Sequence, residues 1–233
     1  MVSEKNEKKN ISTTKRIALF LIGSIGLATL STITLIVFSH LLNVNSNNES
    51  TVLTYINAIS YILVMSIFII ILQPIKLIKI KSDIWKSILI GTSFGGLCLI
   101  LSYIYQSFAY TYYEFGANSN ESGIENMVHA YPIISIIIFV ILGPCSEEIT
   151  YRVGLFGAIN KANKILAYIA TVLIFALIHF DFTSKNIVDE LLNLPSYIIG
   201  AIILTYTYDR YGIVASLSAH ITNNFIAVLN NLI

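Results

Sequence analysis

Long apolar segments constrain this chain more than any other feature of its sequence. Uncharged or nearly uncharged runs recur seven times along its 233 residues. They cover residues 17–42, 51–73, 87–113, 130–146, 165–180, 191–208 and 212–233. Most of them contain the ~20 residues that an α-helix needs to cross the hydrocarbon core of a bilayer. We therefore expect an all-α fold, a polytopic transmembrane helical bundle of about seven spans.

Composition agrees with this fold class and excludes several others. Hydrophobic residues make up 55% of the chain and charged residues only 12%, with a mean hydropathy of +0.75, which is far more apolar than a soluble domain. The formal charge is +1, and basic and aromatic residues do not interleave, so no nucleic acid partner is expected. Cys98 and Cys145 lie in separate predicted spans and indicate neither a disulfide framework nor a thiolate zinc site.

Basic residues predict how the bundle is divided and oriented. We expect a polar cytoplasmic tail at 1–16, three helices within 17–113, and four helices within 130–233. If the helices alternate, the basic residues outside the spans all lie on one side of the membrane except Lys185, which lies on the other side. The basic side comprises Lys5, Lys8, Lys9, Lys15, Arg16, Lys76, Lys79, Lys81, Lys86, Lys161, Lys164 and Arg210. The excess of basic residues predicts a cytoplasmic N-terminus and an external C-terminus.

A few ionisable residues interrupt the last four spans. Such residues cost ~2.5–3.5 kcal/mol each on insertion scales and are functional candidates by default. Glu147, Glu148 and Arg152 lie on the fourth predicted helix, His179 near the end of the fifth, and His220 in the seventh. Purely structural roles are the alternative. Glu148 and Arg152 could form a structural ion pair, His179 could be an interfacial histidine, and His220 could make interhelical hydrogen bonds.

Helical spacing predicts how these side chains are used. Glu148 and Arg152 are four residues apart, with the acid first, which favours an ion pair. Glu147 then points about 100° away around the helix, toward a neighbouring helix or water. His220 and Asn224 share one face of the seventh helix, although Asn223 also faces His220.

The polar stretch KANK at 161–164 predicts the turn of a hairpin between the fourth and fifth helices. Glu147 lies sixteen residues before Asn163 and His179 sixteen after it, so both have the same depth if both arms are helical. His220 lies only ten residues after Arg210, a rise of ~15 Å against ~24 Å for the other two. The helices must tilt, or the hairpin must protrude, to bring all three together, and we expect a cavity reached from the cytoplasmic side.

Glutamate, histidine and asparagine together predict hydrolysis. A buried carboxylate can take a proton from water, and histidine and asparagine donors can stabilise the oxyanion of an attacked carbonyl. Two histidines and one glutamate could equally hold a divalent metal such as zinc with an open position for water. The sequence leaves both mechanisms open, and the HExxH helix of soluble zinc proteases is absent.

Three short motifs resemble a known family. EEITYR (147–152), FALIH (175–179) and HITNN (220–224) resemble the EExxxR, FxxxH and HxxxN signatures of the CPBP intramembrane proteases. This family includes the type II CAAX prenyl endopeptidases and bacterial proteins linked to bacteriocin processing and self-immunity. The resemblance spans 130–233. The small residue that usually follows the arginine is replaced here by Val153, with Gly154 one place later.

The resemblance implies a role for each motif residue. Glu147 would activate water, Glu148 and Arg152 would orient the first motif, and His179 would lie beside the water or a metal. His220 and Asn224 would stabilise the developing oxyanion. Pro144 also precedes the acidic pair in many relatives, where it would loosen the backbone ladder and expose carbonyl groups, or simply kink the helix.

We therefore expect a multi-pass endopeptidase that cuts a membrane-associated peptide or protein near the cytoplasmic face. The bias toward Ile, Asn, Lys and Tyr is typical of an AT-rich bacterial genome, which favours a bacterial substrate over a prenylated CAAX protein. One alternative is a non-catalytic scaffold or bacteriocin immunity protein that binds a partner in the same polar cavity. Another is a small transporter whose buried acids couple to protons.

Overall fold

A computed structural model describes residues 11–42, 49–72 and 83–232, and within these ranges the chain contains helices and no strand. The α-helices are α2 (Thr13–Leu21), α3 (Leu27–Leu42), α4 (Glu49–Leu72), α5 (Ile84–Tyr110), α6 (Ser119–Ala130), α7 (Pro132–Ile136), α8 (Gly143–Glu147), α9 (Gly157–Ile159), α10 (Lys164–Leu177), α11 (Ile187–Tyr211) and α12 (Ile213–Asn230). Three π-helical segments, η1 (Ile22–Gly26), η2 (Ile137–Leu142) and η3 (Glu148–Phe156), join some of these into longer helices.

Six helices in the described ranges are long and apolar enough to cross a membrane. They cover Thr13–Phe38, Thr51–Leu72, Ile84–Tyr110, Pro132–Ile159, Ile187–Tyr211 and Ile213–Asn230. The shorter apolar helix α10 lies where the fifth span was predicted. The expected all-α membrane bundle of about seven helices is therefore confirmed.

The boundaries differ from expectation in two places. The first helix begins at Thr13 rather than Ile17, because the Ser12 side chain accepts a hydrogen bond from the Lys15 backbone N–H and caps it. Part of the predicted polar tail is thus helical, and Arg16 is buried. Helix α6, in the acidic connection before the fourth span, was not predicted. The rest of the tail (1–10) and the basic connection at 73–82 lie outside the described residues.

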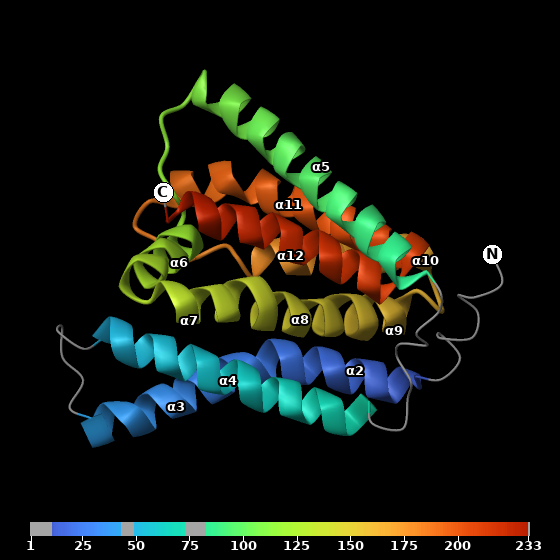
Figure 1. The fold of residues 1–233 in the computed structure, drawn as a ribbon, viewed down its shortest axis with the longest axis horizontal. Helices are drawn as coiled ribbons and strands as arrows, with labels where there is room; N and C mark the ends of the chain where they lie inside the picture. The colour runs from blue at the N-terminus through green and yellow to red at the C-terminus, as the bar shows by residue number, and fades with distance from the viewer. Residues whose placement is uncertain (1–10, 43–48, 73–82, 233) are drawn as a thin grey trace.

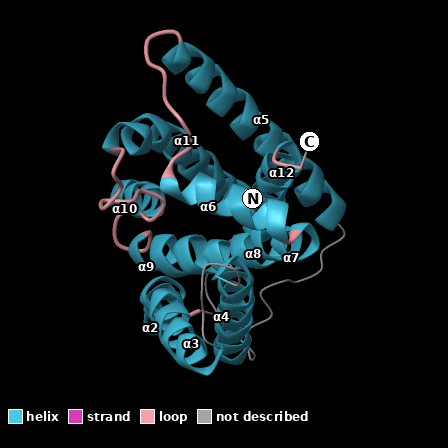
Figure 2. Ribbon diagram, turned by 90° about the vertical axis from the view of Figure 1, so that its left-hand side faces the viewer, coloured by secondary structure: helices cyan, strands magenta, loops and turns pink. Residues whose placement is uncertain are grey.

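The helices lie in three layers, and the middle layer is the helix that contains the acidic pair (Figures 1 and 2). The long helix formed by α7, η2, α8, η3 and α9 runs through the middle. Helices α2, α3 and α4 pack below it, and α10, α11 and α12 pack above it, with α5 crossing obliquely over α11 and α12. The central helix therefore contacts both the N-terminal and the C-terminal helices.

Glycines let the first helix approach the back of the central helix. A Cβ atom on Gly154 would lie 2.9 Å from the Phe20 backbone nitrogen, and one on Gly23 would overlap the Thr150 side chain. The Arg16 guanidinium fits against Gly157 and donates a 2.6 Å hydrogen bond from Nη1 to the Val153 carbonyl. Small residues of this kind allow close backbone packing between membrane helices. The first helix thus supports the segment that bears the acidic pair.

Small residues also seat α5 on α12. A Cβ atom on Gly91 would lie 2.2 Å from the Ala215 carbonyl oxygen, and one on Gly95 would lie 2.5 Å from that of Ala219. Both pairs repeat at a spacing of four residues, so one turn of each helix meets one turn of the other. His220 directly follows Ala219, and this contact therefore helps to set the height and rotation of the histidine.

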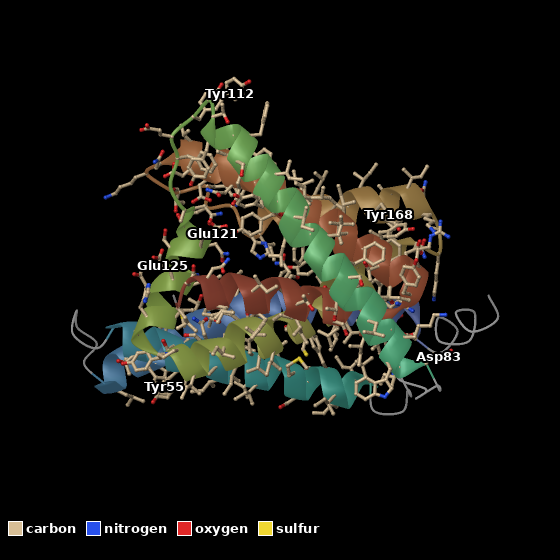
Figure 3. The ribbon with its side chains drawn as sticks, turned by 45° about the horizontal axis from the view of Figure 1, so that its top comes forward. Tyr55, Asp83, Tyr112, Glu121, Glu125 and Tyr168 are labelled. Atoms are coloured by element: carbon tan, nitrogen blue, oxygen red, sulfur yellow. The ribbon has the colours of Figure 1, made fainter. Side chains whose placement is uncertain are left out.

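Basic side chains gather at one end of the bundle. Lys15 Nζ donates to the Ile71 carbonyl at 3.1 Å, and Lys161 Nζ lies 3.3 Å from Thr13 Oγ1. Lys164 Nζ is 2.5 Å from Asp209 Oδ2, which joins the start of α10 to the end of α11. The predicted turn at KANK is present at this end. Figure 3 shows Asp83 and Tyr112 at opposite ends of α5, with Glu121 and Glu125 on α6 nearer the Tyr112 end.

Neighbouring glycines of α5 offer a test of the α5–α12 contact. We expect Gly95→Ala to lower stability by ~1–3 kcal/mol, since the new methyl group would press on a backbone oxygen. Gly96→Ala is the matched control: a Cβ atom there meets nothing within 4 Å, and alanine favours helix by ~1 kcal/mol. Thermal unfolding of the detergent-solubilised protein should show a lower midpoint for Gly95→Ala only. Equal midpoints for the two variants would contradict this packing.

Candidate active site

The central helix changes its hydrogen-bonding register before the acidic pair. In η2 the Gly143 N–H donates to the Ile138 carbonyl, five residues back, which is the π-helical pattern. The next residue, Pro144, has no N–H to donate to Phe139. The Phe139 carbonyl instead accepts a 3.0 Å hydrogen bond from Asn224 Nδ2 on α12. Proline therefore frees a backbone acceptor inside the bundle, and a motif asparagine occupies it.

Glu148 and Arg152 form the predicted ion pair. Arg152 Nη1 lies 3.1 Å from Glu148 Oε1, and both side chains are fully buried. The guanidinium carbon also lies 4.3 Å from the centre of the Phe175 ring, a cation–π contact. Among the described residues no Arg152 nitrogen has a well-directed hydrogen bond. The charge of Arg152 is therefore balanced chiefly by Glu148 and the aromatic face.

Two side chains of α12 converge on the same carboxylate. His220 Nδ1 lies 2.9 Å from Glu148 Oε1, and the Ser216 hydroxyl donates to Glu148 Oε2. A carboxylate only accepts hydrogen bonds, so His220 carries a proton on Nδ1. Ser216 and His220 are one turn apart and present one face to the acid. Glu148 thus fixes both the tautomer and the direction of the imidazole.

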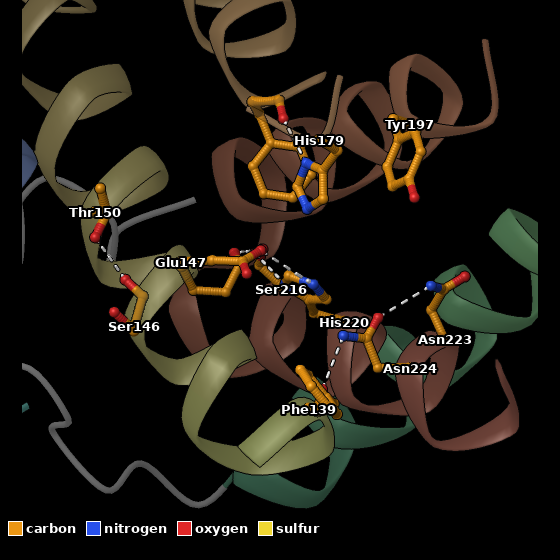
Figure 4. A network of polar contacts seen from close by, with 12 residues as sticks. Phe139, Ser146, Glu147, Thr150, His179, Tyr197, Ser216, His220, Asn223 and Asn224 are labelled. Carbon is orange, nitrogen blue, oxygen red and sulfur yellow. Dashed lines mark hydrogen bonds and ion pairs between the residues drawn. The ribbon is translucent and has the colours of Figure 1, made fainter. Parts of the chain in front are cut away.

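Glu147 points away from the ion pair toward the second nitrogen of His220, as its helical position predicted (Figure 4). Its Oε2 atom lies 3.7 Å from His220 Nε2, beyond a direct hydrogen bond. The Glu147 side chain is 19% exposed, whereas that of Glu148 is not exposed. The first acid is therefore accessible, and the second is structural.

His179 faces the same region from the turn after α10 (Figure 4). Its Nδ1 lies 2.8 Å from the Phe175 carbonyl oxygen, so Nδ1 carries the proton and Nε2 keeps its lone pair. Its ring stacks on Tyr197 with centroids 4.6 Å apart. It also lies close enough to Glu147 and His220 to interact with them electrostatically. Residues of all three motifs therefore lie near one another. They do so although His179 lies sixteen residues after Asn163 and His220 only ten after Arg210.

The motif asparagine binds a backbone carbonyl of the central helix. Asn224 donates to Phe139, and its Oδ1 accepts a 3.2 Å hydrogen bond from Asn223 Nδ2. His220 is paired with Glu148 rather than with Asn224. His220 and Asn224 therefore lie one turn apart on α12 and bind different partners. An amide nitrogen carries two hydrogens, and Phe139 takes one of them.

The side chains that could bind a metal do not cluster in the described part of this structure. Within the described residues no three His, Cys, Asp or Glu side chains lie close enough together to hold a metal ion. Each motif histidine uses Nδ1 for a protein acceptor, Glu148 for His220 and the Phe175 carbonyl for His179, which leaves only Nε2 as a possible ligand atom. As arranged here, the residues do not form a ligand set.

Acidic groups outside the spans hold the segments that flank His179. Hydrogen bonds from the Thr183 hydroxyl and backbone N–H lower the pKa of the exposed Asp181 carboxyl. Burial raises the pKa of the Glu121 carboxyl, and the nearby charge of Glu190 acts in the same direction.

The two histidines outside the motifs are His40 and His129. His129 is exposed and lies 3.8 Å from Glu125. The side chain of His40 lies outside the described part.

Sequence reasoning missed Ser216, Tyr197 and Arg16. Ser216 had a detectable signal, because it precedes His220 by one helical turn and shares its face. Tyr197 and Arg16 had none, since one is among fourteen tyrosines and the other lay in a stretch expected to be a polar tail. Only the packing of distant helices places them near the motifs.

Residues 129–226 match the family described as type II CAAX prenyl endopeptidase Rce1-like. This segment, which is less than half of the chain, is similar to the Rce1-like family. It contains all six candidate residues predicted from the sequence, so the resemblance to the CPBP proteases is confirmed. The Rce1-like segment covers the central helix and α10 to α12, with α6 before them.

Two curated proteins that are similar to this chain come from bacteria. It is 26% identical to "UPF0177 protein YvdC" of Lactococcus lactis over 174 residues, 70% of this chain and 63% of that protein. It is 36% identical to "Putative membrane peptidase YdiL" of Bacillus subtilis over 74 residues, 30% of each chain. The chain thus spans less than two thirds of either relative. No solved structure matches it.

The two adjacent glutamates should differ sharply in their effect on stability. We expect Glu148→Gln to cost ~3–5 kcal/mol, because it leaves the buried Arg152 charge without its acid. The matched change Glu147→Gln should cost little, since that side chain is partly exposed. Thermal unfolding in detergent checks this. Adding Arg152→Met to Glu148→Gln should recover part of the loss, and a strictly additive double variant would argue against coupling.

Proposed function

We propose that this protein is an intramembrane endopeptidase that hydrolyses a peptide bond with a water molecule activated by glutamate and histidine. The family is one of membrane endopeptidases. The observation that supports the activity best is that the two adjacent glutamates have different surroundings. Glu148 is buried and held by Arg152, Ser216 and His220, while Glu147 faces His220 and His179 with no salt bridge to Arg152.

Water would bind between Glu147 and His179. A neutral His179 offers the Nε2 lone pair as an acceptor for one water hydrogen, and the Glu147 carboxylate accepts the other. Glu147 takes its proton as the oxygen attacks the peptide carbonyl carbon. The same proton then passes to the leaving nitrogen as the C–N bond breaks, so the glutamate returns to its starting form.

The oxyanion would form beside His220 and Asn224. For His220 to donate from Nε2 it must carry a second proton. Two carboxylates are then balanced by two cations, the guanidinium of Arg152 and the imidazolium of His220. The second N–H of Asn224 supplies a further donor next to it. Donors that are held in place before reaction are the usual source of oxyanion stabilisation.

The arrangement of charges supports an orientation and a substrate class. Lys15, Lys161, Lys164 and Arg210 meet at one end of the bundle, and the connections at the other end contain mostly acids. The positive-inside rule then puts the basic end and the N-terminus in the cytoplasm. The substrate would be a membrane-associated peptide or protein of a bacterial cell, since the activated water lies within the apolar bundle.

Comparison of peptide termini tests this proposal directly. Membrane proteins and secreted peptides would be collected from deletion cells that carry wild type, Glu147→Gln or Glu125→Gln at matched expression. We expect wild-type termini to be lost with Glu147→Gln, since removal of a general base costs ~10²–10⁴-fold in rate. They should persist with Glu125→Gln, a change to an exposed carboxylate of α6.

The opposite result would favour a different class of protein. If termini are identical in all cells, and Glu147→Gln still complements a deletion phenotype such as peptide sensitivity, the glutamate is not catalytic. The polar site would then bind a partner without turnover, as in an immunity protein.

Metal removal provides a separate test of the mechanism. Once a cleavage site is known, purified protein can be dialysed against a chelator and assayed with a peptide that spans the site. Side-chain activation of water predicts that cleavage continues after dialysis. Loss of cleavage with recovery on added zinc would instead establish the metal-assisted form, in which Glu147, His179 and His220 would hold the ion.

A further inference from the structure

We infer that Tyr197 and Asn118 are positioning residues that hold the His179 ring in the orientation needed to bind water. This inference rests on the proposed function, because it assigns His179 a role in orienting the attacking water. Tyr197 lies outside all three motifs, on α11, and Asn118 precedes α6. Neither residue stands out in the sequence.

His179 needs positioning because it does not lie in a regular helix. Helix α10 ends at Leu177, and the His179 N–H makes only a three-residue bond to the Ala176 carbonyl at 3.2 Å. The irregular segment that follows extends to the start of α11 at Ile187. One side-chain hydrogen bond, from Nδ1 to Phe175, leaves the ring free to swing about that bond. Further contacts are therefore required to fix its plane.

Stacking on Tyr197 fixes the plane of the His179 ring. The tyrosine ring is nearly parallel to that of His179, with an interplanar angle of 19° and centroids 4.6 Å apart. Phe175 packs nearby, with its centroid 5.0 Å from that of the histidine and tilted by 48°. Stacked aromatic rings prefer offset parallel packing of this kind. The histidine can then rotate little without losing contact with the tyrosine (Figure 4).

Asn118 joins the tyrosine and the histidine backbone. Its Nδ2 donates to the His179 carbonyl at 3.2 Å, and its Oδ1 accepts from the Tyr197 hydroxyl at 3.3 Å. Asn118 is only 1% exposed. Asn120 Nδ2 donates to the Tyr197 oxygen from the other side at 3.2 Å. One amide therefore sets the backbone of His179 and the aromatic ring that stacks on it at the same time.

Glu190 anchors this assembly to the end of the bundle. Its two carboxylate oxygens accept hydrogen bonds from the Ser119 N–H at 2.8 Å and the Asp181 N–H at 3.0 Å. Asn193 adds a 2.9 Å bond from Nδ2 to the Gly116 carbonyl. The segment at the start of α6 is thus tied to α11 and to the turn that contains His179. This connection therefore braces His179.

Variants of Tyr197 separate the ring contact from the hydroxyl contact. Tyr197→Leu removes stacking, and we expect a 10- to 100-fold loss of kcat with KM changed less than about threefold, since a small misplacement of a reacting group is costly. Tyr197→Phe keeps the stack and should retain kcat to within about fivefold. Tyr206→Leu is the matched control on the same helix, because Tyr206 contacts Phe94 and not the site. The assay uses a fluorogenic peptide that spans the Glu147-dependent cleavage site.

A spectroscopic measurement tests the positioning without relying on cleavage. Nitrogen NMR of ¹⁵N-histidine-labelled protein in detergent reports the tautomer of His179, with the signal assigned by its absence in His179→Gln. We expect one tautomer, protonated at Nδ1, in wild type and Tyr197→Phe, and a mixture in Tyr197→Leu and Asn118→Ala. The Tyr206→Leu spectrum should match wild type.

The two measurements distinguish failure of this inference from failure of the proposed function. If wild type shows no Glu147-dependent cleavage, the endopeptidase proposal fails, and the NMR spectra alone decide whether Tyr197 orients the ring. If cleavage is present but Tyr197→Leu keeps both its kcat and its His179 tautomer, the positioning role is overturned. Equal losses of kcat in Tyr197→Leu and Tyr206→Leu would likewise overturn it, because they would reflect general destabilisation.

Discussion

The ion pair between Glu148 and Arg152 is the constraint on which the rest of the site depends. Two opposite charges in an apolar bundle are tolerable only if they remain together, because either one alone would be an uncompensated buried charge. Their pairing leaves Glu148 with lone pairs that Ser216 and His220 satisfy. A carboxylate that stabilises a cation in its own helix therefore also docks α12 at a defined height. The accessible Glu147 is the group left over.

Close backbone packing makes this arrangement possible without a hydrophobic driving force between the helices. Lipid tails are as apolar as leucine side chains, so membrane helices associate through shape and polar contacts. Gly154 lets the first helix support the central helix, and Gly91 and Gly95 seat α5 on α12. The N-terminal helices, which precede the segment that matches the Rce1-like family, thus have a structural role. They hold the two helices that present Glu147 and His220.

Much of the site followed from short-range rules. The four-residue spacing of Glu148 and Arg152 gives the ion pair on any helix, and the 100° step to Glu147 separates the two acids. The turn at KANK follows from its polarity among apolar residues. The π register in the central helix did not follow, because a one-residue change in hydrogen bonding has no reliable signal in hydropathy. Its effect is substantial, since it leaves the Phe139 carbonyl available to accept a hydrogen bond from Asn224.

The sequence by itself determined that this chain is an all-α membrane protein and which polar residues are candidates for one site, since hydropathy and helical spacing are local properties. The tertiary structure alone decided what each polar atom contacts. His220 bonds to Glu148, Arg16 is buried against Gly157, and Tyr197 stacks on His179. These contacts join residues far apart in the chain. Their partners depend on the rotation and height of whole helices, which are set by packing that no single segment encodes.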